Sequence, residues 1–75
     1  MGQRSILVVE DEPLIAMMLE DFLESLGHSV TATCESVSDA MEHADKGGFD
    51  LAILDVNLKG ESVWPVAERL RDKQI

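Results

Sequence analysis

Two short apolar runs in this chain each end directly in acidic residues, and this pairing limits the folds that the chain can adopt. Residues 6–9 (ILVV) are followed by Glu10 and Asp11, and residues 51–54 (LAIL) are followed by Asp55. Each run has the length and composition of a strand that is buried on both faces of a parallel sheet. The chain is therefore expected to build a parallel sheet whose strands end in carboxylates.

The segments that follow these runs have the apolar spacing of helices. Pro13 suits the first turn of a helix, because its missing N–H would have no intrahelical partner there. Ser36, with Asp39 three residues later, predicts the start of a second helix through an acidic form of the capping box. A third helix is expected from Ser62, with Pro65 in its first turn. The expected apolar stripes are Ile15, Met18, Leu19, Phe22, Leu23 and Leu26; Val37, Ala40, Met41 and Ala44; and Val63, Val66, Ala67 and Leu70.

The remaining segments complete an alternating order of strands and helices. Residues 28–33 (HSVTAT) alternate in polarity, as in an edge strand with one wetter face, and residues 56–62 (VNLKGES) predict a loop. The order strand, helix, strand, helix, strand, helix with right-handed crossovers predicts an α/β fold with helices on both faces of a parallel sheet. The first and third strands are the most apolar, so we expect them to be neighbours, which gives the strand order 2-1-3.

This strand order predicts a cluster of carboxylates. Ligands of open parallel sheets bind beyond the carboxyl ends of the strands, where the strand order reverses, so Glu10, Asp11 and Asp55 should converge there. Two carboxylates about 5 Å apart repel by about 3 kcal/mol at an effective dielectric of about 20. A shared divalent cation removes this repulsion, and ligands that are all oxygen favour Mg²⁺ or Mn²⁺ over zinc. Glu12 alone is explained more simply by its favourable position at a helix N-terminus.

Composition excludes several classes of partner. The net charge of -9 and the pI near 4.3 give the chain no electrostatic attraction to nucleic acid or to an anionic membrane. Cys34 is the single cysteine, so no internal disulfide forms, and the reducing cytoplasm is the expected location. The N-terminus does not have the pattern of a signal peptide, and no apolar run reaches the ~20 residues that span a bilayer.

The sequences ILVVEDEP and DLAILDVNL, at this spacing, resemble the receiver domain of two-component response regulators. The resemblance covers residues 1–75 and implies a flavodoxin-like sheet in a signalling module rather than an enzyme. It implies that Asp55 accepts a phosphoryl group from a histidine kinase or a phosphotransfer protein. It also implies that Glu10 and Asp11 hold Mg²⁺ together with Asp55, and that Asn57 contributes its backbone carbonyl as a further ligand.

The chain departs from the family pattern in two ways. Lys59 stands where the family usually has a proline. A whole receiver has five βα units, whereas residues 1–75 hold three, so the family's switch hydroxyl on strand four and its lysine on strand five have no counterpart; Lys46, Lys59 and Lys73 lie in the wrong elements. We therefore expect a partial receiver with weak phosphorylation and impaired switching. The bare edge of the third strand is expected to form a homodimer or oligomer, which light scattering would detect.

The sequence is also compatible with two alternative functions. Haloacid-dehalogenase-type phosphatases also phosphorylate a strand-end aspartate, but they place a second aspartate where this chain has Asn57. A pseudo-receiver would bind partners without phosphate, although the intact set of three acids argues against such degeneration. Trp64, expected to be at least half-buried, offers a fluorescent probe for Mg²⁺ titration, and beryllofluoride binding with and without Asp55→Asn separates the alternatives.

Overall fold

The structure is a computed structural model that describes residues 2–55, 57–58 and 60–75. A three-stranded parallel sheet has the order β2-β1-β3, and a separate antiparallel pair is formed by β4 and β5. The predicted α/β class and the strand order 2-1-3 are confirmed. The elements are β1 (Ser5–Val9), α1 (Pro13–Ser25), β2 (Ser29–Cys34), α2 (Val37–Lys46), β3 (Leu51–Leu54), β4 (Asn57–Leu58), β5 (Glu61–Ser62) and α3 (Trp64–Asp72).

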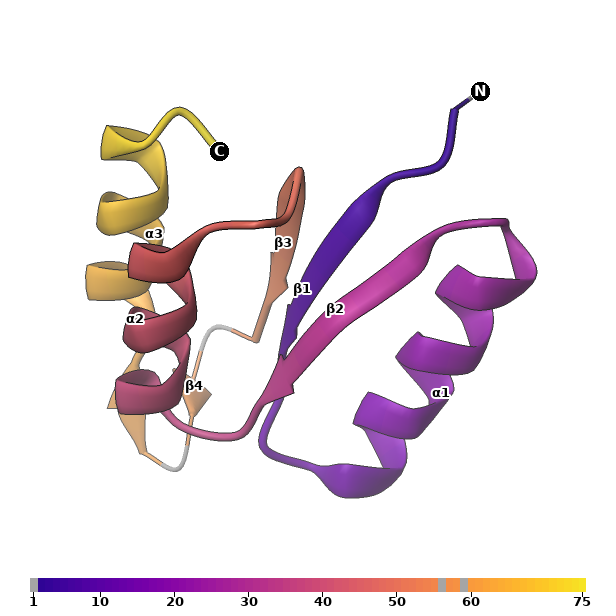
Figure 1. Ribbon diagram of the computed structural model, residues 1–75. Helices are drawn as coiled ribbons and strands as arrows, with labels where there is room; N and C mark the ends of the chain where they lie inside the picture. The colour runs from indigo at the N-terminus through magenta and orange to yellow at the C-terminus, as the bar shows by residue number, and fades with distance from the viewer. Residues whose placement is uncertain (1, 56, 59) are drawn as a thin grey trace.

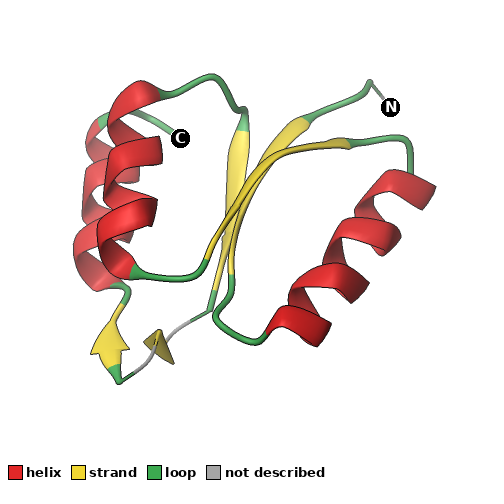
Figure 2. Cartoon of the chain, turned by 60° about the horizontal axis from the view of Figure 1, so that its bottom comes forward, coloured by secondary structure: helices red, strands yellow, loops and turns green. Residues whose placement is uncertain are grey.

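Helices cover both faces of this sheet. Figure 1 shows α1 on one side of the three strands and α2 with α3 on the other, as right-handed crossovers require. The turned view in Figure 2 places the small β4–β5 pair beneath α2 and α3, at the end of the molecule where β1 and β3 finish. Within the described ranges, no helix has the length and apolar character needed to cross a membrane.

Strand β1 is the centre of the core. The side chains of residues 6–9 are at most 2% exposed, which confirms the prediction that this run is buried on both faces. Leu7 and Val9 pack with α2 and α3, whereas Ile6 and Val8 pack with Leu23 of α1, because successive side chains of a strand point to opposite faces. In the described part of the chain β3 pairs with β1 on one side only, and its residues remain partly exposed.

The predicted starts of α1 and α2 are confirmed, and α1 begins at Pro13. The Ser36 hydroxyl accepts a hydrogen bond from the Asp39 N–H at 3.2 Å and so caps α2. Gly27 follows α1 with φ of 90°, a left-handed conformation that glycine adopts without steric cost. The apolar stripe of α2 also faces the core, with Ala40 and Ala44 fully buried.

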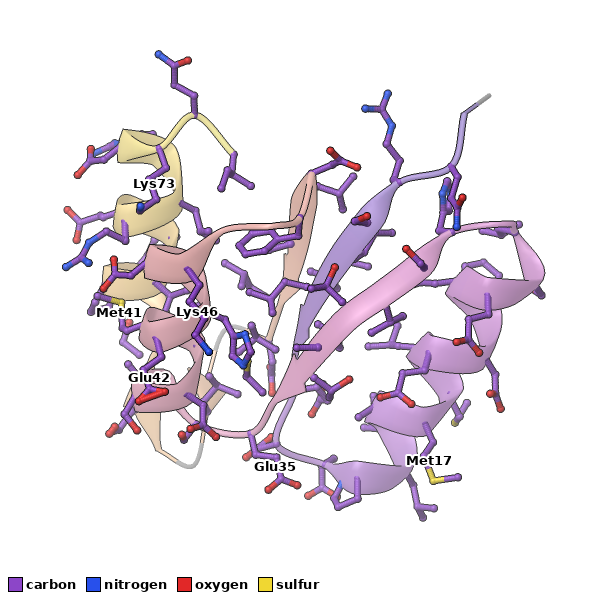
Figure 3. The ribbon with its side chains drawn as sticks, in the orientation of Figure 1. Met17, Glu35, Met41, Glu42, Lys46 and Lys73 are labelled. Carbon is purple, nitrogen blue, oxygen red and sulfur yellow. The ribbon has the colours of Figure 1, made fainter. Side chains whose placement is uncertain are left out.

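The predicted core face of α1 is partly wrong. Leu23 is buried and Leu19 partly so, but Phe22 and Met18 are 59% and 69% exposed. Apolar residues surround most of this helix, so their spacing alone does not decide which side meets the sheet. The side that docks carries the small residue Ala16, which lets α1 lie close to the strands. Figure 3 shows Met17 on the outer side of α1.

The segment predicted as a loop contains the β4–β5 hairpin, and α3 starts later than predicted. Helix α3 begins at Trp64 with Val63 as its N-cap, and Pro65 lies in the first turn as expected. The Ser62 hydroxyl, predicted as the N-cap, instead accepts a hydrogen bond from the Trp64 N–H at 3.2 Å. Val63 is the buried residue at the start of this helix, and the Trp64 side chain is 66% exposed. The prediction that Trp64 is at least half-buried is therefore wrong.

The corrected orientation of α1 predicts different costs for two neighbouring truncations. Leu23→Ala removes a side chain that packs against Ile6 and Val8, so the free energy of unfolding should fall by about 2–4 kcal/mol. Phe22→Ala removes a larger but exposed side chain and should change it by no more than about 0.5 kcal/mol. Urea unfolding followed by circular dichroism measures both values, and equal costs would contradict this orientation.

Candidate functional site

Backbone hydrogen bonds bring the ends of β1 and β3 to the same level. Val9 pairs with Leu54 in the parallel ladder, and the next N–H, that of Asp55, donates to the Val9 carbonyl at 2.9 Å. On the other side of β1, the Glu10 N–H donates to the Cys34 carbonyl at 2.9 Å. The backbones of Glu10 and Asp55 are therefore held side by side at the sheet edge.

Three carboxylates meet at this edge. Carboxylate oxygens of Glu10, Asp11 and Asp55, one from each residue, all lie within 4.8 Å of one another. The Glu10 side chain is 8% exposed, and its Oε2 accepts a hydrogen bond at 3.0 Å from the N–H of Glu12, the N-cap of α1. Among the described residues this is the one group of three or more acidic, histidine or cysteine side chains with a spacing that suits a metal ion.

The chemistry of this cluster favours a hard divalent cation. At this separation two carboxylates repel by about 3 kcal/mol at an effective dielectric of about 20. Mg²⁺ and Mn²⁺ prefer oxygen ligands, and Mg²⁺ is typically bound through one or two carboxylates with several waters. The donor set of Glu10, Asp11 and Asp55 fits either ion, and the partial exposure of Asp11 and Asp55 leaves the site accessible to solvent.

The other residues considered from the sequence lie elsewhere or remain untested. Asn57 begins β4, two residues after Asp55, and the role of its backbone carbonyl stays a prediction. Lys59 lies outside the described residues. Lys73 donates to the Asp45 carbonyl at 3.3 Å, and Figure 3 shows it at the opposite end of the molecule from Glu35, which follows β2. Lys73 is therefore too remote to act at the carboxylate cluster.

Sequence reasoning missed the backbone groups that hold Glu10. The Glu12 N–H and the Cys34 carbonyl both bond to Glu10, but a main-chain donor or acceptor leaves no mark on residue identity. Pro13 was the one available signal. It places the helix start immediately after Glu12, and the first N–H groups of a helix have no intrahelical partner and are free to bind a carboxylate.

Comparison with known proteins identifies the family of this chain. Residues 6–75 match the description "Response regulator receiver domain". The chain belongs to the response regulator receiver domain family. This receiver domain is 42% identical over 71 residues to the uncharacterized transcriptional regulatory protein YkoG of Bacillus subtilis, a match that covers 95% of this chain and 31% of YkoG.

Solved structures of similar chains agree with this assignment. The solution structure of SdrG from Sphingomonas melonis is 53% identical with a TM-score of 0.91, over 100% of this chain and 65% of SdrG. The crystal structure of the response regulator PhyR from Brucella abortus is 33% identical with a TM-score of 0.89, over 99% of this chain and 31% of PhyR. Among curated relatives such as YkoG, the receiver domain spans about a third of the length of the protein it matches.

The buried thiol of Cys34 is expected to make the stability of the receiver domain pH-dependent. Burial, with a smaller contribution from the charge of Asp39, raises the pKa of Cys34 from 9.0 to about 11. The folded state therefore holds the thiol proton more tightly than the unfolded state. Its contribution to stability should be complete below about pH 9 and should decline as the pH rises from 9 towards 11.

Replacement by alanine provides the matched control for this effect. Wild type should lose more stability than Cys34→Ala between pH 8 and pH 10.5 in urea unfolding experiments, after each protein is referred to its own value at pH 8. Identical pH dependence in the two proteins would contradict a buried, protonated Cys34 thiol.

Proposed function

We propose that this receiver domain accepts a phosphoryl group on Asp55 from a histidine kinase or phosphotransfer protein. Glu10, Asp11 and Asp55 are the proposed ligands of a Mg²⁺ or Mn²⁺ ion, with the Asn57 backbone carbonyl as a further ligand. The observation that carries this proposal is the convergence of three carboxylates from two adjacent strand ends to within 4.8 Å. Family membership supplies the reaction class, and the geometry of this chain supplies the residues.

The proposed reaction is a displacement at phosphorus. A carboxylate oxygen of Asp55 forms the new P–O bond while the P–N bond of the donor phosphohistidine breaks, and the electron pair of that bond stays on the imidazole nitrogen. When bound, the divalent cation neutralises the charge that develops on the phosphoryl oxygens. The product on Asp55 is an acyl phosphate, whose hydrolytic lability makes the signal resettable.

The chain's own residues contribute positioning to this reaction. The hydrogen bond from the Asp55 N–H to Val9 fixes the backbone of the acceptor. The hydrogen bond from the Glu12 N–H holds one oxygen of Glu10 and so fixes the orientation of this proposed ligand. Pre-positioned groups of this kind reduce the reorganisation that phosphoryl transfer requires, because the reaction depends mainly on orientation and on neutralisation of charge.

This receiver is proposed to work in the cytoplasm as a component of a phosphorelay rather than as an enzyme. Its strongly acidic composition suits basic regions of a protein partner and gives it no electrostatic attraction to nucleic acid. Self-association through the outer edge of β3 remains a prediction, supported by the partial exposure of that strand.

The alternative function is a pseudo-receiver that binds its partners without phosphate. The similarity of this chain to PhyR does not distinguish a pseudo-receiver from a phosphorylated receiver. A pseudo-receiver, however, has no need to keep three carboxylates that repel one another close together. The phosphatase alternative gains no support from the comparisons, and Asn57 stands where such enzymes have a second aspartate.

Phosphorylation by a small phosphodonor tests the proposal directly. Incubation with phosphoramidate and Mg²⁺ should add one phosphoryl group to the wild-type chain, slowly, and EDTA should prevent it. Asp55→Asn should abolish the adduct, whereas Asp21→Asn, the same change at an exposed position of α1, should leave it intact. Intact-mass spectrometry at neutral pH reports the adduct. A folded wild-type chain that never gains mass would favour the pseudo-receiver.

A further inference from the structure

We propose that the β4–β5 hairpin is a positioning device for the cation site, with Leu58 and Gly60 as its positioning residues. This inference rests on the cation site proposed above. The hairpin contributes one proposed ligand, the Asn57 backbone carbonyl, and its further role is to hold Asp55 and Asn57 beside the Glu10–Asp11 pair. Figure 2 shows the hairpin at the end of the molecule where β1 and β3 finish.

The segment that carries Asp55 is held at both of its ends. At its start, the Asp55 N–H is bonded to the Val9 carbonyl at 2.9 Å. At its end, Asn57 and Leu58 enter the antiparallel ladder, in which Asn57 pairs with Ser62 and Leu58 with Glu61. Because only one residue separates Asp55 from Asn57, a displacement of the hairpin would be transmitted almost fully to Asp55.

Leu58 anchors this hairpin in the protein core. Its side chain is 1% exposed and belongs to the same buried cluster as Val63 and Val66, at the start of α3. A hairpin with two residues in each strand is too short to be stable through its own backbone hydrogen bonds. The burial of Leu58 therefore supplies the stability that ties the hairpin to the fixed part of the fold.

Gly60 sets the conformation of the hairpin turn. Its φ is 82°, in the left-handed region that residues with a side chain rarely adopt. A Cβ atom placed on Gly60 would meet nothing within 4 Å, so an alanine there would strain the backbone and would not clash with any neighbour. Gly60→Ala is thus expected to change the path of the hairpin without disturbing the packing around it.

Affinity for a cation depends on how well the surrounding structure orients the ligands. Removal of groups that orient metal ligands, without removal of a ligand, typically weakens binding by about 10–100-fold. One carboxylate oxygen from each of the three ligands of this site lies within 4.8 Å of the other two. A displaced Asp55–Asn57 segment would break this arrangement, so the loss should appear in cation affinity.

A pair of glycine substitutions separates positioning from general backbone strain. Gly48→Ala is the control, because Gly48 also has a positive φ, of 90°, and an empty space around its Cβ position. It lies between α2 and β3, at the other end of β3 from the carboxylates. Titration with Mn²⁺, with free ion counted by electron paramagnetic resonance, should show affinity about 10-fold weaker for Gly60→Ala. Gly48→Ala should match wild type within about twofold.

A second pair of substitutions tests whether Leu58 anchors the hairpin. It also provides a test if either alanine variant fails to fold. Leu58→Val and Leu70→Val remove the same volume from the same buried cluster, and both side chains are at most 4% exposed. Both should lower the urea midpoint to a similar degree. Leu58→Val alone should weaken Mn²⁺ binding, because Leu70 lies near the end of α3 and outside the hairpin.

The outcomes of these titrations are distinct. Weaker Mn²⁺ binding by Gly60→Ala and Leu58→Val, with unchanged binding by their controls, supports the positioning role. Equal affinity of each variant and its control overturns the positioning role and leaves the proposed cation site standing. A wild-type chain without saturable Mn²⁺ binding overturns the cation site and this inference with it.

Discussion

Parallel pairing between β1 and β3 is the interaction on which the rest of this receiver depends. The pairing of Val9 with Leu54 sets the level at which both strands end, and the Asp55 N–H extends the ladder by one more hydrogen bond. A shift of one residue in this register would turn every side chain of one strand to the opposite face. The buried, alternating side chains of β1 prevent such a shift, so packing on both faces of the sheet fixes the geometry of the carboxylates.

Function and stability oppose each other at this sheet edge. The nearly complete burial of residues 6–9 stabilises the folded state. Repulsion between the carboxylates of Glu10, Asp11 and Asp55 destabilises it. Each close carboxylate pair costs about 3 kcal/mol at an effective dielectric of about 20, before any cation binds. A cation that binds only the folded arrangement of these carboxylates is therefore expected to stabilise the fold.

The features that could be predicted from the sequence are those with a strong local or alternating pattern. The two apolar runs determined the strand order, and Ser36 marked the start of a helix through specific capping chemistry. The exposed side of α1 was missed because its apolar residues surround the helix, so tertiary packing and not periodicity chooses the face. The hairpin after Asp55 was missed because strands of two residues have no detectable period.

The free energy of unfolding in EDTA and in Mg²⁺, compared for wild type and Asp55→Asn, tests the central claim most directly. If the three carboxylates repel one another and share a cation, Asp55→Asn should be the more stable protein in EDTA, because one charge of the cluster is gone. Wild type alone should then gain substantial stability from Mg²⁺. Equal stability of the two proteins in EDTA, together with an equal response to Mg²⁺, would contradict the account.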